Sequence, residues 1–142
     1  MEEFDPLLLR NQLCFPLYAA SKALTRSYEP YLEPLNLTYT QYIVMMAMWE
    51  KKRCDVKELG EMVCLDSGTL SPLLSKLVSK GYLSKSRQAD GRYREISLTQ
   101  EGEKLREKAL EVPSKIGSCV RLSPEEAALL YKLAYKVLEN LQ

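Results

Sequence analysis

Four cysteines, at positions 14, 54, 64 and 119, carry the most reactive side chains of this 142-residue sequence. None forms a C-x-x-C pair, and the sequence contains no histidine. This spacing does not predict a zinc site or any other metal site, and the lack of histidine excludes Ser/His/Asp and Cys/His catalysis. In a reducing compartment the thiols are expected to be free, and a free thiolate is open to oxidation by peroxides.

Cys14 is the cysteine whose surroundings best suit a sensing thiol. Arg10 lies four residues before it and tyrosine hydroxyls lie nearby, so both can stabilise a thiolate. The alternative is a small buried hydrophobic side chain. Cys54, in the segment KKRCD, is read as a loop residue, and Cys64 ends an apolar run. Both are interpreted as structural or incidental.

The segment 65–81, LDSGTLSPLLSKLVSKG, is the element around which the rest of the chain is organised. Its leucines recur at helical spacing and predict one buried stripe, whereas the opposite face carries small and basic residues. An ordinary amphipathic surface helix would show the same stripe. Either Asp66 or Ser67 caps this helix, or Ser71 caps it with Pro72 at the first helical position. In both cases hydroxyl groups crowd the positive helix end, where they can meet a phosphate or a base edge; these belong to Ser67, Thr69 and Ser71.

A second short helix precedes this segment and a hairpin follows it. Asp55 and Glu58 have the spacing of a capping box that opens the preceding helix. Residues 82–86 and 93–98 alternate in polarity around a glycine-containing turn, which predicts a two-stranded hairpin with a basic tip. Residues 65–94 contain six basic and two acidic residues, although the net charge of the whole chain is only +1. Helix, turn, helix and basic hairpin are the order of a winged helix.

The rest of the chain predicts a single domain over 1–142, mainly α-helical with a small β-hairpin wing. The winged helix-turn-helix spans 37–99. Thr38 is expected to cap its first helix, which is apolar nearly all round as far as Trp49 and is therefore a buried central helix. Thr99 is expected to cap a helix over 100–112, and Ser123 with Glu126 has the spacing of a capping box that opens the final helix. Helical segments at 1–36 and 100–142 have too little core of their own and are expected to dimerise. No apolar run is long enough for a membrane span and the N-terminus is acidic, so we expect a cytoplasmic protein.

Three separated motifs resemble the MarR-type winged-helix regulators over essentially the whole chain. NQLCF at 11–15, LTYTQY at 37–42 and LDSGTLSPLL at 65–74 are similar to the organic-hydroperoxide-resistance repressors and their thiol-based relatives in virulence control. The wing sequence Asp90-Gly91-Arg92 resembles the wing signature of the family. The sequence differs from the family pattern at Thr40, where a proline is usual, at Pro16, and in a wing about one residue shorter.

The resemblance implies a role for each matching residue. Cys14 would be the peroxide-sensing thiol, with Tyr28 and Tyr39 of the partner subunit hydrogen-bonded to it. Cys119 would resolve oxidised Cys14 in an intersubunit disulfide, or else a small-molecule thiol would do so. The DNA contacts expected from the resemblance and from the basic stretch are those of Asp66, Ser67, Thr69, Ser71, Lys76, Lys85, Arg87, Asp90 and Arg92.

The sequence therefore leads to one main hypothesis and two alternatives. The main hypothesis is a homodimeric repressor, without a cofactor, that binds a palindromic operator in double-stranded DNA and releases it when an organic hydroperoxide oxidises Cys14. One alternative keeps the fold but gates it by a small phenolic ligand between the dimerisation helices and the winged domain. The other is a thiol peroxidase that consumes peroxide through Cys14.

Overall fold

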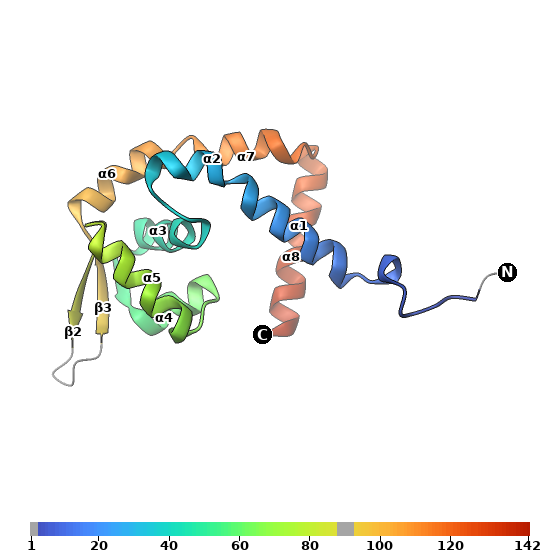
Figure 1. Ribbon diagram of the computed structural model, residues 1–142, viewed down its shortest axis with the longest axis horizontal. Coiled ribbons are helices and arrows are strands. Elements are labelled where there is room, and N and C mark those ends of the chain that lie inside the picture. Colours follow the sequence, from blue (N-terminus) through green and yellow to red (C-terminus); the bar gives the residue numbers. More distant parts are fainter. Residues whose placement is uncertain (1–2, 88–92) are drawn as a thin grey trace.

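The computed structural model describes residues 3–87 and 93–142, which form a mainly helical chain with one small antiparallel sheet (Figure 1). In chain order the elements are η1 (Leu9–Asn11), α1 (Cys14–Ser27), α2 (Glu29–Leu32), η2 (Glu33–Leu35), α3 (Tyr39–Lys51), β1 (Arg53–Asp55), α4 (Val56–Val63), α5 (Ser67–Ser79), β2 (Leu83–Arg87), β3 (Tyr93–Leu98), α6 (Gln100–Ala109), α7 (Val112–Val120) and α8 (Pro124–Leu141).

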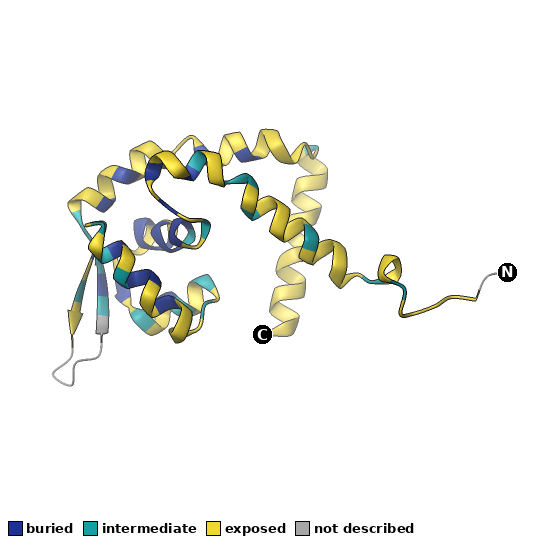
Figure 2. Cartoon of the chain, viewed as in Figure 1, coloured by how far each residue is buried: buried dark blue, intermediate teal, exposed yellow. Residues whose placement is uncertain are grey.

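The hydrophobic core lies between α3, α4, α5 and the sheet, and buried side chains of α2, η2, α6 and α7 extend it (Figure 2). Helix α3 is its centre, because its side chains are buried nearly all round, as its continuous apolar sequence predicts. Val44, Met45 and Met48 are fully buried there. Helix α5 adds the leucines of its predicted stripe, at 70, 73, 74 and 77. The predicted helix-turn-helix and wing are confirmed.

The predicted caps start the helices where the sequence places them. The Thr38 and Ser123 hydroxyls accept the backbone N–H of Gln41 and Glu126, and both caps form complete capping boxes. Asp55 caps α4 by accepting the N–H of Lys57. The box predicted there is incomplete, because the carboxylate of Glu58 pairs instead with Lys51 at 3.1 Å.

A third strand joins the wing and was missed by the sequence prediction. The segment read as a loop around Cys54 forms β1, and the strand order is β1-β3-β2 with Cys54 opposite Ile96. Cys54 and Ile96 are both buried. A three-residue strand is too short to show alternation in the sequence, and its partner lies some forty residues further along the chain.

The first and last long helices, α1 and α8, lie outside this core and expose their apolar side chains. Helices α1 and α8 contain no buried residue, as the exposed colouring in Figure 2 shows. Among the described residues, nineteen of the twenty-one exposed large hydrophobic side chains lie in 1–36 and 100–142. The helix predicted over 100–112 ends at Ala109, and Pro113 lies in the first turn of α7 rather than breaking a longer helix.

Within the described part of the chain, no helix is both long enough and apolar enough to cross a membrane.

Candidate functional site

The outer face of α5 carries most of the predicted DNA contacts. Leu70 and Leu77 are buried in the core, so the opposite side of the helix faces solvent. Ser67, Thr69 and Ser71 are exposed in the first turns, and Lys76 is exposed further along the helix. The helix therefore presents small hydroxyl side chains at its positive end and a cation two turns away, which suits phosphate and base contacts.

Asp66 is the N-cap of α5. Its Oδ1 accepts the backbone N–H of Thr69 at 2.8 Å, and this hydrogen bond holds the pKa of the carboxyl below its usual value. Of the two predicted starts, the structure has the one with Asp66 as cap, and Ser71 is not a cap. Pro72 lies inside the helix, where it removes the N–H that would bond the carbonyl of Gly68.

The wing lies beside α5, since β2 packs against that helix (Figure 1). Lys85 and Arg87 are on β2, half-buried and exposed respectively. Two of the predicted wing contacts, Asp90 and Arg92, lie outside the described residues. Lys85 and Arg87 thus lie on a strand that packs directly against α5.

Cys14 is exposed and is the first residue of α1. Tyr28, its predicted partner residue, is the C-cap at the other end of the same helix. Fourteen helical residues at 1.5 Å each separate the two by about 20 Å. Cys14 and Tyr28 of one chain are therefore too far apart to touch. The predicted contact would need the Tyr28 of a second subunit.

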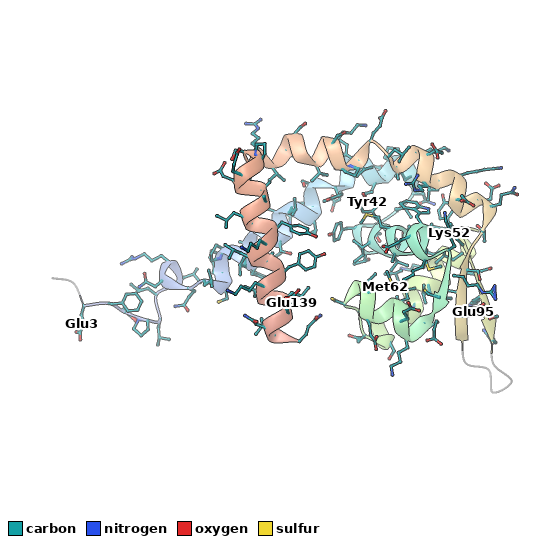
Figure 3. The ribbon with its side chains drawn as sticks, turned by 180° about the vertical axis from the view of Figure 1, so that it is seen from behind. Glu3, Tyr42, Lys52, Met62, Glu95 and Glu139 are labelled. Atoms are coloured by element: carbon teal, nitrogen blue, oxygen red, sulfur yellow. The ribbon has the colours of Figure 1, made fainter. Side chains whose placement is uncertain are left out.

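Tyr28 and Tyr39 are brought together within the chain, with ring centroids 5.0 Å apart. Tyr42, labelled in Figure 3, adds a third ring 5.7 Å from Tyr28. Burial, and secondarily the neighbouring tyrosines, raises the pKa of Tyr28 and of Tyr42, so both phenols keep their protons at neutral pH. From the sequence, Tyr42 was predicted only as part of the apolar central helix. Its position three residues after Tyr39 on a helix is the signal that could have placed it in this cluster.

Cys119 lies in the last turn of α7, with its Sγ 3.6 Å from the hydroxyl of Tyr31 on α2. Tyr31 was not predicted as a site residue, because its partner is 88 residues away in sequence. The hydrogen bond to Cys119 is the main cause that raises the pKa of Tyr31. Lys115 completes the cluster, with its Nζ 5.6 Å from the centre of the Tyr31 ring.

The two other cysteines have separate surroundings. The thiol of Cys54 donates to Met48 Sδ at 3.6 Å in the core, and burial raises its pKa. Cys64 is exposed in the turn between α4 and α5, where it has a positive φ of 56° and accepts a hydrogen bond from the side chain of Gln142. No group of three His, Cys, Asp or Glu side chains with metal-site geometry occurs among the described residues.

An open groove of about 660 Å³ lies where α1 and α2 meet the start of α3 and the end of α5. Three cations line it, Lys22, Arg26 and Lys80, together with the carboxylates of Glu29 and Glu33. Tyr39 also lines the groove. The groove therefore connects the tyrosine cluster to the C-terminal end of α5.

Comparison with known proteins places this geometry in a family. The sequence profile described as "Transcriptional regulator SarA/Rot" matches residues 26–109. The chain is 41% identical to the organic hydroperoxide resistance transcriptional regulator of Bacillus subtilis, covering 98% of this chain and 95% of the relative. It is 42% identical to the HTH-type transcriptional regulator SarZ of Staphylococcus aureus, covering 84% and 82%.

The fold is likewise similar to that of AbfR, a Staphylococcus epidermidis protein. Overoxidised AbfR bound to DNA superposes with a TM-score of 0.75 at 31% identity, covering 94% of this chain and 95% of AbfR. Reduced AbfR has also been solved on DNA, and AbfR has been solved with its disulfide formed. These relatives are regulators of transcription rather than enzymes, which argues against the peroxidase alternative. The chain therefore belongs to the SarA/Rot family of MarR-type winged-helix transcriptional regulators, proteins that act on double-stranded DNA.

Proposed function

We propose that this chain is a homodimeric repressor that releases its operator when an organic hydroperoxide oxidises Cys14. The observation that carries the proposal is the separation of about 20 Å between Cys14 and the tyrosine cluster of the same chain. A thiol at one end of α1 and phenols at the other form a complete site only if a second copy brings its Cys14 to Tyr28 and Tyr39.

The exposed apolar surface supports a second copy as the missing partner. Helix α8 exposes eight large hydrophobic side chains and α1 exposes its own, which a soluble monomer rarely tolerates as one surface. In this proposal segments 1–36 and 100–142 form the dimer interface, and segment 37–99 binds DNA. The two α5 helices of a two-fold dimer then read the two halves of a palindromic operator.

The sensing step oxidises the sulfur of Cys14 and reduces the hydroperoxide. The thiolate attacks one peroxide oxygen, an S–O bond forms, the O–O bond breaks, and the alkoxide takes up a proton and leaves as an alcohol. The phenol of Tyr28, kept protonated by its raised pKa, donates a stronger hydrogen bond to the thiolate than to the neutral sulfenic acid or disulfide that oxidation leaves. The thiolate is also at the positive end of α1, which favours its negative charge.

Release of DNA follows from the spacing of the two reading helices. Oxidation removes the thiolate that the phenols of the partner hold, so the two subunits lose one of their fixed contacts. A rigid pair of α5 helices fits two half-sites only at one spacing, and a small change in that spacing weakens binding. AbfR has been solved on DNA both reduced and overoxidised, and it has also been solved in a disulfide form, so the oxidised state that releases DNA in this proposal is a disulfide of Cys14.

Heterodimers test the contact across subunits. A Cys14→Ser chain is co-expressed with a Tyr28→Phe/Tyr39→Phe chain. In the heterodimer, Cys14 of the second chain faces the intact tyrosines of the first chain. The other site has neither the thiol nor the two phenols. We expect half the fast-reacting Cys14 of wild type, measured as dimedone-trapped sulfenic acid after cumene hydroperoxide. Tyr28→Phe/Tyr39→Phe homodimers are the control and should react slowly throughout. Equally slow reaction of heterodimers and control homodimers would contradict a site shared between subunits.

The groove favours a second candidate function, gating by a small aromatic acid. Its three cations outnumber its two carboxylates, which leaves a net positive charge that suits an acid, and Tyr39 offers an aromatic face. Salicylate added to the DNA complex in excess reductant distinguishes the two functions. DNA release that depends on salicylate and is lost in Arg26→Gln supports ligand gating, whereas release only on oxidation supports the thiol mechanism.

A further inference from the structure

Tyr31, Lys115 and Cys119 form a cluster that the sensing step above does not use. We propose that Tyr31 is a positioning residue for Cys119, holding its sulfur where it attacks oxidised Cys14 of the partner subunit. This inference rests on the proposed oxidation of Cys14. It assigns a role to a third tyrosine, besides Tyr28 and Tyr39.

Helix α2 brings the two parts of this arrangement together. Tyr28 is the residue that precedes α2 and Tyr31 lies three positions later, so the two share one side of a single helical turn. The N–H of Tyr31 donates to the carbonyl of Tyr28 at 3.0 Å, which fixes this turn. Helix α7 packs on α2, and the Sγ of Cys119 meets the Tyr31 hydroxyl at 3.6 Å. The thiol of Cys119 is therefore held beside the tyrosine cluster that is to receive Cys14.

Electrostatics separates the roles of the two cysteines. Cys14 begins α1, where the helix dipole favours a negative charge, whereas Cys119 lies in the last turn of α7, where the dipole opposes one. Peroxide should therefore oxidise Cys14 first. The hydroxyl of Tyr31 can donate a hydrogen bond to the Cys119 sulfur and so hold that sulfur in place for the second step.

Lys115 lies against the same tyrosine. Its ammonium is 5.6 Å from the centre of the Tyr31 ring and one turn before Cys119 on α7, so a cation–π contact helps to hold the ring beside the cysteine. The neighbouring sulfur raises the pKa of Tyr31 and keeps the proton on the phenol. The phenol thus stays a donor to Cys119 at neutral pH.

The resolving step balances with the thiols and the hydroperoxide alone. The Cys119 sulfur attacks the sulfur of the Cys14 sulfenic acid, the S–S bond forms and the S–O bond breaks. Hydroxide leaves and combines with the proton of the Cys119 thiol to give water. In sum, two thiols and one hydroperoxide give one disulfide, one alcohol and one water.

To test the role of Tyr31, the full-length protein is treated with one equivalent of cumene hydroperoxide and the reaction is stopped at a series of times. Dimedone trapping measures Cys14 sulfenic acid, and non-reducing gels measure the covalent dimer. In Tyr31→Phe we expect sulfenic acid to form at the wild-type rate and the disulfide to form about fivefold more slowly, the factor for one lost hydrogen bond. Tyr82→Phe, which removes a phenol oxygen from a ring packed on the winged domain, is the matched control and should behave as wild type.

Each outcome decides the proposal. Disulfide formation at the wild-type rate in Tyr31→Phe, or an equal slowing of sulfenic acid formation, overturns the positioning role while leaving Cys14 as sensor. Absence of Cys14 sulfenic acid in the wild type overturns the proposed function instead. Alkylation of Cys119 by iodoacetamide across pH, in a Cys14→Ser background, is the second measurement. Loss of the Tyr31 hydroxyl should slow the alkylation of Cys119 at neutral pH. An unchanged dependence of the alkylation rate on pH contradicts the proposal even where Tyr31→Phe lowers stability.

Discussion

Lys80 Nζ donates to the side-chain oxygen of Gln41 at 2.9 Å and so joins the end of α5 to the first turn of α3. The same ammonium donates to the carbonyl of Asn36 at 2.6 Å. Gln41 is buried and also completes the capping box of Thr38, immediately beside Tyr39. Helix α5, the proposed DNA-reading helix, is therefore tied directly to the segment that carries one of the proposed sensor tyrosines.

Replacing Lys80 with methionine should lower the free energy of unfolding by about 1 kcal/mol, the scale of a charged hydrogen bond at a partly exposed site. The loss leaves the buried oxygen of Gln41 with one donor fewer. Urea unfolding followed by circular dichroism measures the change. Lys76→Met, which alters an exposed lysine one turn earlier on α5, is the control and should change stability by less. Equal stability of Lys80→Met and wild type would show that the link carries no stabilisation.

Acid should weaken the start of α5 through Asp66. Its pKa is lowered in the folded protein by the hydrogen bond from Thr69, so its contribution is present above the pKa of the unfolded chain and is lost as pH falls below about 4. The stability difference between wild type and Asp66→Ala should be constant near neutral pH and shrink on acidification. Asp66→Asn, which keeps a capping oxygen without a charge, is the control. A difference independent of pH down to 3 would contradict the role of the ionised cap.

Two helical glycines provide a matched test of packing. A Cβ on Gly102 would collide with the carbonyl of Tyr82, and its own carbonyl accepts the indole N–H of Trp49 at 2.8 Å. Gly102→Ala should destabilise the fold by about 1–3 kcal/mol. A Cβ on Gly117 meets nothing within 4 Å, so Gly117→Ala should be neutral or stabilise α7 by up to about 1 kcal/mol. Thermal unfolding of both variants checks the pair, and an equal effect of the two would contradict it.

Lys76 should contribute to the affinity for DNA and not to the stability of the fold. Fluorescence anisotropy with a duplex selected from a random-sequence library measures binding across salt concentrations. Lys76→Gln should weaken binding and reduce the slope of log K against log salt by about 1, as expected for one lost phosphate contact. Lys104→Gln, on α6 and paired with Glu101, is the charge-matched control and should leave the slope unchanged. An unchanged slope for Lys76→Gln would remove Lys76 from the interface.

Local signals in the sequence predicted most of the fold. Thr38, Asp66, Thr99 and Ser123 begin their helices because a cap depends on a side chain and a backbone N–H only a few residues away. Strand β1 and the end of α6 were missed or misplaced because they depend on contacts far along the chain. The packing of Gly102 on Tyr82 is one such contact, which no short sequence pattern records.

The candidate site was less open to prediction than the fold. Helix α5, the proposed recognition helix, was visible in the sequence because its buried leucines repeat with the period of a helix. The Tyr31–Cys119 contact and the Lys80–Gln41 contact join residues 88 and 39 positions apart and leave no periodic signal. The departure from the family pattern at Pro16 has a simple local reason, because Pro16 lies in the first turn of α1, where no backbone donor is needed.

Gel-shift analysis of wild type and Cys14→Ser shows whether oxidation of Cys14 controls DNA binding. Both proteins are bound to the selected duplex and treated with cumene hydroperoxide, then with excess reductant. We predict that wild type releases DNA on oxidation and rebinds on reduction, while Cys14→Ser stays bound throughout. Release of Cys14→Ser by the hydroperoxide as readily as wild type would contradict the account.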